Sequence, residues 1–327
     1  MKSLYQIVYG WLLYFSPRKD HFNAAMAHLV YGLHNWVLRR CPEDTTFKAR
    51  ILGFDFLLPA GHLLPVYLCE NPDQEKPLLD LVATMQGHGR PEDFVMLDVG
   101  ANIGDTAIPS ALLVPHGTFL CIEGSPGFFQ FLKRNVERAG MSGRFLLRET
   151  LCGEAGDLEQ GLAIESNFGS GVVKRGDGGE GPPLATLDQI LEEAGLRDRV
   201  SLIKIDTDGF DYRVLRGGRQ CLETRHPVLY FELAPTVLRD QDEDPLGIFP
   251  MLRECGYSHF LLYTNFGEFF GHGRIDEPAG MDFLKQAIDY ALRHRRFFYD
   301  IVVLEEAHHS LRADLLAAAA NSGARNG

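Results

Sequence analysis

Several features that mark specialised protein classes are missing from this sequence of 327 residues. The six cysteines include no C-x-x-C pair, which argues against a zinc site or a disulfide framework and favours reduced thiols. Long apolar runs are also missing, because the apolar stretch over residues 4–15 is too short to span a bilayer. We therefore expect a cytoplasmic protein without a transmembrane segment.

An excess of positive charge is missing as well, since the formal net charge is −12. Such a balance disfavours a nucleic-acid backbone or an anionic membrane as the main partner. The apolar fraction of 45% and the charged fraction of 23% are ordinary for a globular protein. An uncharged or cationic small substrate, or a glycan, fits this composition better.

The length predicts one α/β domain with an N-terminal extension. We expect a mainly helical extension and cap over residues 1–90, the α/β domain over 91–307 and a flexible tail over 308–327. Within the extension, residues 21–40 have the spacing of a helix, whereas residues 46–58 alternate like strands around a turn.

The apolar segment 4–15 admits three interpretations. It can form an amphipathic helix that packs on the domain or on a partner, or a helix that touches a membrane surface. A signal peptide is the third, but the charged residues Arg18 to His21 stand where a cleavage region should be small and uncharged. We favour the packed amphipathic helix.

Apolar strand-like runs alternate with amphipathic helices from Phe94 to Leu304. This order predicts a doubly wound, Rossmann-like and mostly parallel sheet of seven strands. The last two strands, with a helix between them, are expected to form an antiparallel edge. Residues 153–183 interrupt the pattern with many glycines, notably over 169–181, and are either disordered or a functional loop over the substrate.

The stretch from Phe94 to Gly104 predicts a buried strand, a glycine turn and the start of a helix. In a doubly wound sheet this is a nucleotide-type site. The turn departs from the dinucleotide pattern, because Asn102 stands between Gly100 and Gly104 and a third glycine is missing. A carboxylate at Asp98 would repel a pyrophosphate but could hold an ammonium or sulfonium group. S-adenosylmethionine carries both groups and no phosphate.

Two further strand ends carry acids. Glu123 closes the second strand, where an acid can accept both ribose hydroxyls of either NAD or S-adenosylmethionine. Lys204, Asp206, Asp208 and Asp211 cluster at the end of the fourth strand. The plain alternative for this cluster is a solvated turn in which Asp206 or Asp208 caps the next helix.

Together these segments resemble the FkbM family of S-adenosylmethionine-dependent methyltransferases. The resemblance rests on DVGANIGDTA, IEGSP and LIKIDTDGFDYRVLRGG followed by LYFEL, and it covers about residues 94–234. The family pattern I-D-V-E-G-x-E is here Ile205 to Asp211, with both glutamates shortened to aspartate. The pattern E-P-x-P is here Glu123 to Pro126. The resemblance implies a class I methyltransferase fold and methylation of hydroxyls on sugars or secondary metabolites.

Site residues follow from the strand ends and from this resemblance. Cofactor contacts are expected from Asp98, Gly100, Asn102, Gly104, Glu123 and Ser125. For catalysis we expect Asp206 first and Asp208 next, with Lys204 orienting either. A divalent cation held by Asp206, Asp208 and Glu232 is an alternative way to activate the hydroxyl.

Two rival functions stay open. A nicotinamide-dependent oxidoreductase should have a third glycine in the turn and a Ser-Tyr-Lys or similar hydride site, and we find neither in the sequence. A non-catalytic relative that only binds partners would be favoured by loss of the acidic cluster, which is present.

Overall fold

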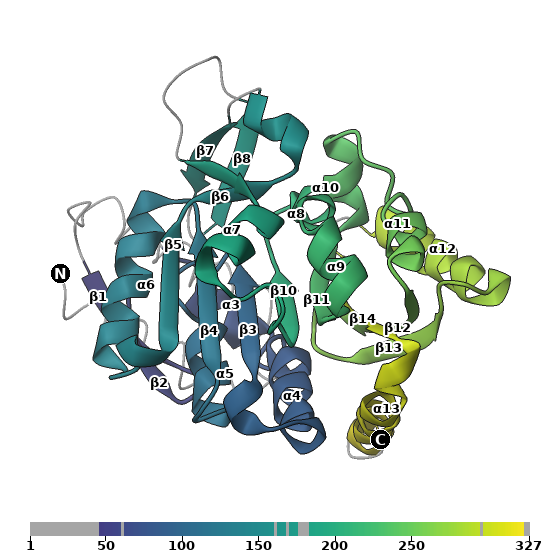
Figure 1. The fold of residues 1–327 in the computed structure, drawn as a ribbon, viewed down its shortest axis with the longest axis horizontal. Coiled ribbons are helices and arrows are strands. Elements are labelled where there is room, and N and C mark those ends of the chain that lie inside the picture. The colour runs from purple at the N-terminus through teal and green to yellow at the C-terminus, as the bar shows by residue number, and fades with distance from the viewer. Residues whose placement is uncertain are drawn as a thin grey trace, which may run out of the picture.

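The computed structural model describes residues 46–59, 62–159, 162–167, 170–175, 183–294 and 297–323. The predictions for residues 4–15 and 21–40 lie outside the described residues. Figure 1 shows a central twisted sheet with helices on both faces. The predicted doubly wound α/β fold is confirmed.

The central sheet has the strand order β13-β12-β14-β11-β10-β3-β4-β5. Five neighbouring strands, from β11 to β5, are parallel, and β14, β12 and β13 form the predicted antiparallel edge. The bounds are β3 Val95–Val99, β4 Thr118–Glu123, β5 Phe145–Glu149, β10 Leu202–Ile205, β11 Val228–Leu233, β12 Tyr257–Thr264, β13 Phe269–Arg274 and β14 Tyr299–Glu305.

The sheet therefore has eight strands instead of the predicted seven. The additional strand, β13, pairs antiparallel with β12. Its sequence is FFGHGR, in which Gly271 and Gly273 interrupt the apolar alternation that identifies a strand. A side chain at either glycine would collide with the ring of Phe283 or Phe260, so close packing accounts for both.

Helices divide between the two faces of the sheet, each over its own apolar core. One face packs against the following helices: α4 Lys76–Met85, α5 Ala107–Leu113, α6 Pro126–Arg138 and α13 His309–Gly323. The other face packs against α7 Leu187–Ala194, α8 Asp211–Gly217, α9 Arg219–Arg225, α10 Pro235–Asp240, α11 Phe249–Glu254 and α12 Pro278–Arg293. Helix α3 spans Leu64–Glu70, and short 3-10 turns occupy Gln86–His88, Pro91–Asp93, Ser142–Arg144, Ala155–Glu159 and Glu306–His308.

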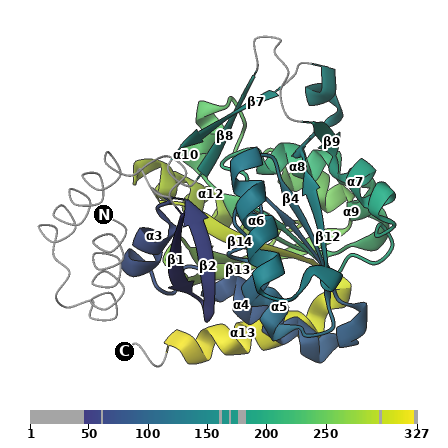
Figure 2. The same ribbon diagram turned by 90° about the vertical axis from the view of Figure 1, so that its left-hand side faces the viewer.

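The described part of the extension is tied closely to the α/β domain. Strands β1 (Thr46–Ile51) and β2 (Phe54–Pro59) form the predicted hairpin. The amide of Asn135 on α6 bonds the backbone of Leu57 in both directions, at 2.8 and 2.9 Å, and also bonds the carbonyl of Ile103 at 2.9 Å. Figure 2 shows the hairpin beside α6. Residues 46–59 thus form the predicted strands and add apolar side chains to the core of the domain.

Two local features differ from a simple alternation of strands and helices that ends in a flexible tail. The segment after β10 forms two helices, α8 and α9, which meet at Gly218, where a Cβ would stand 2.7 Å from the side chain of Leu187. The expected flexible tail contains α13, whose Leu311 and Leu315 are buried against the core near α4 (Figure 2). Apolar side chains at helical spacing hold this segment down.

The glycine-rich interruption is more regular than predicted. Strands β7 (Leu162–Asn167) and β8 (Ser170–Arg175) form an antiparallel hairpin at the top of Figure 1. Its base is a parallel pair of short strands, β6 (Leu151–Gly153) and β9 (Leu184–Thr186). Thr186 also starts α7 with a capping box, in which its hydroxyl accepts a hydrogen bond from the backbone of Gln189.

Cys121, Cys152, Cys221 and Cys255 are buried free thiols. None of the described helices combines the length and the apolar composition that crossing a membrane requires.

Candidate active site

Three of the predicted site residues, Asp98, Lys204 and Glu232, lie in two rows across the sheet. In the first row Asp98 of β3 is in register with Lys204 of β10, which is in register with Tyr230 of β11. In the second row Glu232 of β11 is paired with Asp300 of β14. Side chains two positions apart along a strand point to the same face of the sheet. The two rows therefore share one face, at the carboxyl ends of the parallel strands.

Lys204 is the centre of the first row. Its Nζ lies 3.0 Å from Asp98 Oδ1 and 3.4 Å from Asp206 Oδ2, and it donates to the carbonyl of Gly100 at 3.4 Å. Burial alone would lower the pKa of Lys204, but the carboxylates of Asp98, Asp206 and Asp105 together raise it well above its ordinary value. Lys204 is therefore a permanent cation that joins the glycine turn to the end of β10.

Asp98 is turned toward the protein. It is 1% exposed, and its second oxygen accepts a hydrogen bond of 2.6 Å from the Thr106 hydroxyl. Both of its oxygens therefore lie against protein groups, and the expected contact between Asp98 and a ligand stays a prediction. Of the two carboxylates that pair with Lys204, Asp206 is the one that faces solvent, and its side chain is 50% exposed.

The glycines of the turn are explained by packing and backbone angle. Gly100 has φ +79°, and a Cβ there would lie 1.8 Å from the carbonyl oxygen of Asp206. Gly104 has φ +88° and packs against the side chains of Leu132 and Ile108. Only glycine adopts such angles readily. The absent side chain at Gly100 thus lets the turn approach the end of β10.

Glu123 and Ser125 close the other side of the turn. Glu123 accepts the amide of Asn102 at 2.8 Å with one oxygen and the amide of Ser125 at 2.7 Å with the other. Burial raises the pKa of Glu123, and these two hydrogen bonds counteract the rise. Each carboxylate oxygen can accept two hydrogen bonds, so both keep a lone pair for a ligand hydroxyl. His62 Nε2 lies 3.0 Å from Asn102 Oδ1, and burial lowers the pKa of His62 to about 4.

The turn after β10 is held by Asp211, and α8 has no side-chain cap hydrogen bond that would support the alternative in which Asp206 or Asp208 caps it. Asp208 has φ +52° and Gly209 has φ +103°. Asp211 Oδ2 accepts from the Thr207 hydroxyl at 3.1 Å and from the Gly209 amide at 3.2 Å. Burial and the charge of Asp206 raise the pKa of Asp211 to about 6. Asp206 is therefore not engaged in capping.

Three acids that the sequence analysis missed lie near Lys204. Glu75 stands at the start of α4, Asp105 just before α5, and Asp300 on β14. Burial raises the pKa of Glu75 to about 8, of Asp105 to about 7 and of Asp300 to about 8, and the charge of Asp206 adds to each rise. Asp105 adjoins the glycine turn and could have been noticed. Nothing in the local sequence around Glu75 or Asp300 marks them.

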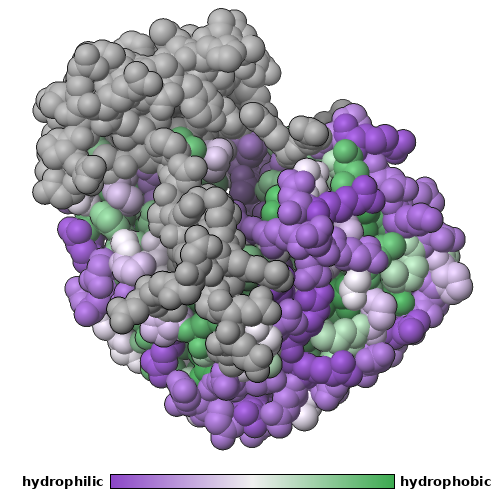
Figure 3. Space-filling view, turned by 90° about the horizontal axis from the view of Figure 1, so that it is seen from above, coloured by the Kyte–Doolittle hydropathy of each residue, from purple (hydrophilic) through white to green (hydrophobic). Residues whose placement is uncertain are grey.

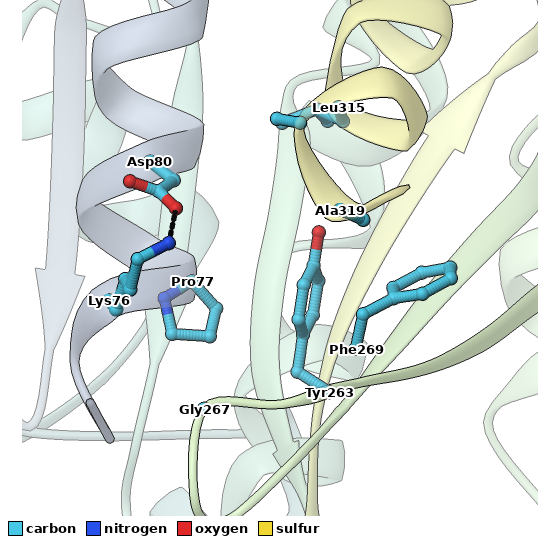
Figure 4. Close-up of a pocket in the computed structure, with 9 residues that line it drawn as sticks. Lys76, Pro77, Asp80, Tyr263, Gly267, Phe269, Leu315 and Ala319 are labelled. Atoms are coloured by element: carbon cyan, nitrogen blue, oxygen red, sulfur yellow. Dashed lines mark hydrogen bonds and ion pairs between the residues drawn. The ribbon is translucent and has the colours of Figure 1, made fainter. Parts of the chain in front are cut away.

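Two hollows lie away from these residues. Figure 4 shows the first, where Lys76 pairs with Asp80 on α4 and Tyr263 and Phe269 face them from β12 and β13. The second, of about 400 Å³, opens at the opposite edge of the sheet and is lined by groups such as His88, Arg90, Arg225, His226 and His308. Neither hollow is lined by a predicted site residue.

Residues 98–258 match the family model of the methyltransferase FkbM domain. The chain contains an FkbM methyltransferase domain. This confirms the resemblance inferred from the sequence. The FkbM domain begins at Asp98 and includes the glycine turn, Glu123 and the end of β10, whereas Glu75 and Asp300 lie outside the matched residues.

Three solved structures with similarity to the chain are distant from it in sequence. The methyltransferase FkbM from Methylobacillus flagellatus KT is 16% identical, with 60% of this chain and 56% of that chain covered and a TM-score of 0.37. The O-methyltransferase from Bacillus cereus in complex with SAH is 12% identical, with 90% and 96% covered and a TM-score of 0.39. M. jannaschii TYW2 in complex with AdoMet is 11% identical, with 81% and 89% covered and a TM-score of 0.40. A comparison with curated protein sequences gave no match.

The FkbM domain shows no ready-made metal centre. Among the described residues, no group of three or more His, Cys, Asp or Glu side chains has the arrangement needed to hold a metal ion. Asp206 is paired with Lys204, and Glu232 is paired in register with Asp300. The alternative in which Asp206, Asp208 and Glu232 bind a divalent cation stays a prediction.

Proposed function

We propose that the chain is an S-adenosylmethionine-dependent O-methyltransferase that acts in the cytoplasm on a hydroxyl of a small molecule or glycan. The observation that carries this proposal is the placement of Asp206, a half-exposed carboxylate held by Lys204 directly beside the glycine turn. Ligands of doubly wound sheets bind outside this edge. The FkbM domain match supports methyl transfer as the reaction.

The residues around the turn fit an adenosyl ligand without phosphate. Glu123 is fixed by two backbone amides and keeps lone pairs for the two ribose hydroxyls. The surplus of carboxylates around Lys204 suits a ligand that carries an ammonium and a sulfonium group. S-adenosylmethionine, when bound, supplies an electrophilic methyl group on sulfur.

Asp206 is the proposed general base. A hydroxyl is a poor nucleophile until a base takes its proton. The ammonium of Lys204, 3.4 Å from Asp206 Oδ2, fixes the orientation of that carboxylate, and its exposed part can pass the proton on to water. Asp208 follows in the same turn and stays the second candidate.

The acceptor class rests on charge. A net charge of −12 disfavours polyanionic acceptors and is compatible with neutral or cationic small molecules and glycans. The described surface seen from above, on the side of β7 and β8, is mostly hydrophilic (Figure 3). A polar acceptor suits such surroundings.

One experiment tests the cofactor. The thermal shift of the purified protein is measured with S-adenosylhomocysteine, with NAD and with neither. We expect stabilisation by S-adenosylhomocysteine only. Stabilisation by NAD alone would overturn the proposal, and no shift with either ligand would favour a non-catalytic binding protein.

A second experiment tests the base. Asp206→Asn should keep the shift with S-adenosylhomocysteine and lose methyl transfer, measured as S-adenosylhomocysteine released with a panel of sugars. Asp289→Asn, an exposed change on α12, is the matched control and should keep both. Transfer at the wild-type rate in Asp206→Asn would exclude Asp206 as the base.

A further inference from the structure

One histidine ties the N-terminal extension to the glycine turn. His62 follows β2 and is 3% exposed. Its backbone amide donates to the carbonyl of Pro59 at 3.3 Å, and its ring lies edge-on to that of Phe128, with the ring centres 5.5 Å apart. Burying a polar ring is costly unless its polar atoms are hydrogen-bonded. The partners of the two ring nitrogens therefore indicate the role of His62.

These two nitrogens bond to different parts of the chain. Nδ1 accepts the backbone amide of Leu64, the first residue of α3, at 3.3 Å. Burial lowers the pKa of His62 to about 4, so the ring is neutral at pH 7 and carries a single N–H. Because the accepting Nδ1 has no proton, that proton is on Nε2. Nε2 therefore donates to Asn102 Oδ1, which lies 3.0 Å away.

This hydrogen bond fixes the side-chain amide of Asn102. The oxygen of the amide faces His62, so its NH₂ group points in another direction. Asn102 is partly exposed and lies in the glycine turn, between Gly100 and Gly104. A cofactor that binds against the turn therefore meets an asparagine side chain whose orientation is already set.

The backbone of the turn is anchored at the same place. Asn102 has φ +48°, an uncommon angle for a residue with a side chain. Such an angle persists only where the surroundings hold the residue. The amide of Asn102 donates to Glu123, and its side-chain oxygen accepts from His62. The next carbonyl, that of Ile103, accepts from Asn135 at 2.9 Å.

Two of these three anchors involve the chain that precedes the FkbM domain. His62 itself lies outside the matched residues 98–258. Asn135 is fully buried and also holds the backbone of Leu57 on β2 in both directions. The glycine turn is thus held by Glu123 inside the family domain and by a segment outside it.

We propose that His62 is a positioning residue of the cofactor site, which orients Asn102 and so keeps the glycine turn in the conformation that binds S-adenosylmethionine. This inference rests on the proposed function and adds a residue of the N-terminal extension to its cofactor site. The competing explanation is that His62 serves only the start of α3, through its bond to Leu64. The two roles use different ring nitrogens, so substitutions can separate them.

Two substitutions at position 62 distinguish the nitrogens. The side-chain amide of asparagine reaches about as far as Nδ1, and the amide nitrogen of glutamine about as far as Nε2. His62→Asn should therefore keep the bond to Leu64 and lose the one to Asn102, whereas His62→Gln should keep a donor for Asn102.

His259→Leu is the matched control. His259 is also 3% exposed and is also bonded through both ring nitrogens. It lies on β12, which is separated from β3 by β14, β11 and β10. Its loss should lower stability in urea without changing the affinity for S-adenosylhomocysteine.

Titration calorimetry of the full-length protein with S-adenosylhomocysteine measures the effect. We expect His62→Asn to bind about fivefold to tenfold more weakly than wild type, the effect of one hydrogen bond, and His62→Gln to bind like wild type. In an Asn102→Ala background, His62→Asn should have no further effect on affinity, because it acts through Asn102. In the ligand-free protein, amides over residues 98–106 should exchange hydrogen faster in His62→Asn and unchanged in His62→Gln and His259→Leu.

Two outcomes would overturn this inference. The first is an affinity of His62→Asn equal to that of wild type. The second is a loss of affinity that His62→Gln shares in full or that is equally large in the Asn102→Ala background, because His62 would then act through the start of α3. Failure of S-adenosylhomocysteine to bind wild type would instead refute the proposed function. The exchange rates would still decide whether His62 holds the turn, and unchanged rates in His62→Asn would show that it does not.

Discussion

The ammonium nitrogen of Lys204 lies 3.0 Å from Oδ1 of Asp98, and both side chains are almost completely buried. The pair joins two neighbouring parallel strands, β3 and β10, at the level where the glycine turn begins. Asp98 therefore fixes Lys204, and its contact with a ligand stays a prediction. Lys204 in turn reaches the exposed carboxylate of Asp206. Asp98, expected to contact the cofactor, and Asp206, expected to act as the base, are thus both paired with Lys204.

Removing Lys204 should destabilise the protein strongly. Lys204→Met leaves Asp98 buried without its counter-charge, and breaking such a pair costs about 3–5 kcal/mol in the free energy of unfolding. The double variant Asp98→Asn/Lys204→Met should recover a large part of that loss. Urea denaturation of wild type, Asp98→Asn, Lys204→Met and the double variant forms a double-mutant cycle. Lys285→Met, at an exposed position of α12, is the control. Additive effects would show that the two side chains do not interact.

Glu123 should matter for cofactor affinity. In Glu123→Gln one carboxylate oxygen becomes an amide NH₂, which cannot accept the hydrogen bond that Asn102 or Ser125 now donates. We expect S-adenosylhomocysteine to bind at least about tenfold more weakly, the effect of one charge-assisted hydrogen bond. Glu137→Gln, on the exposed side of α6, should bind like wild type. Equal affinity in both variants would remove Glu123 from the cofactor site.

Much of the fold could be predicted because it is encoded locally. The parallel strands are short apolar runs, and α7 is marked by its capping box from Thr186 to Gln189. Strand β13 escaped prediction because its glycines serve contacts with Phe260 and Phe283, which are distant in sequence. Helix α13 was missed because its alanine-rich sequence has only two buried leucines to hold it on the domain.

The site residues that belong to sequence motifs could be predicted. The residues that only the tertiary structure brings to the site could not. Asp98, Glu123 and Asp206 end consecutive parallel strands, so the topology alone brings them to one edge. Asp300 reaches the same edge at the amino end of an antiparallel strand, and Glu75 reaches it at the start of a helix that packs on the sheet. Neither position follows from a pattern in the sequence.

The stability of the ligand-free protein should fall as the pH rises through neutrality. The pKa of Asp300 is raised from 3.8 to about 8, so between these values the folded protein holds a proton that the unfolded chain has released. The free energy of unfolding therefore decreases with pH until the folded acid ionises. Glu75, raised from 4.5 to about 8, acts in the same direction.

Urea denaturation at pH 7.0, 7.75 and 8.5 measures this slope above the range in which the histidines titrate. Asp300→Asn should reduce the slope, whereas Asp289→Asn, exposed on α12, should leave it unchanged. A slope in Asp300→Asn as steep as that of wild type would show that Asp300 is already ionised in the folded protein.

A side chain at Gly100 should destabilise the protein for two reasons: its positive φ and its close contact with Asp206. Gly53 has a similar φ without a close contact, so a substitution there measures the first effect alone. Gly53, in the turn of the β1–β2 hairpin, has φ +86° with open space around its Cβ position, whereas Gly100 has φ +79° and would place a Cβ 1.8 Å from the carbonyl oxygen of Asp206. Gly53→Ala should therefore cost only the left-handed conformation, about 1–2 kcal/mol. Gly100→Ala should cost clearly more, because the turn must also move away from β10.

That movement has a functional consequence. Gly100 contributes the carbonyl that Lys204 contacts, so displacing the turn disturbs the cation that holds Asp206. We expect Gly100→Ala to lose affinity for S-adenosylhomocysteine and methyl transfer together, while Gly53→Ala keeps both. Urea denaturation and calorimetry on the two variants decide the matter. Equal losses of stability in the two variants would show that the end of β10 can move to accept a side chain. The close contact with Asp206 would then not explain the glycine at position 100.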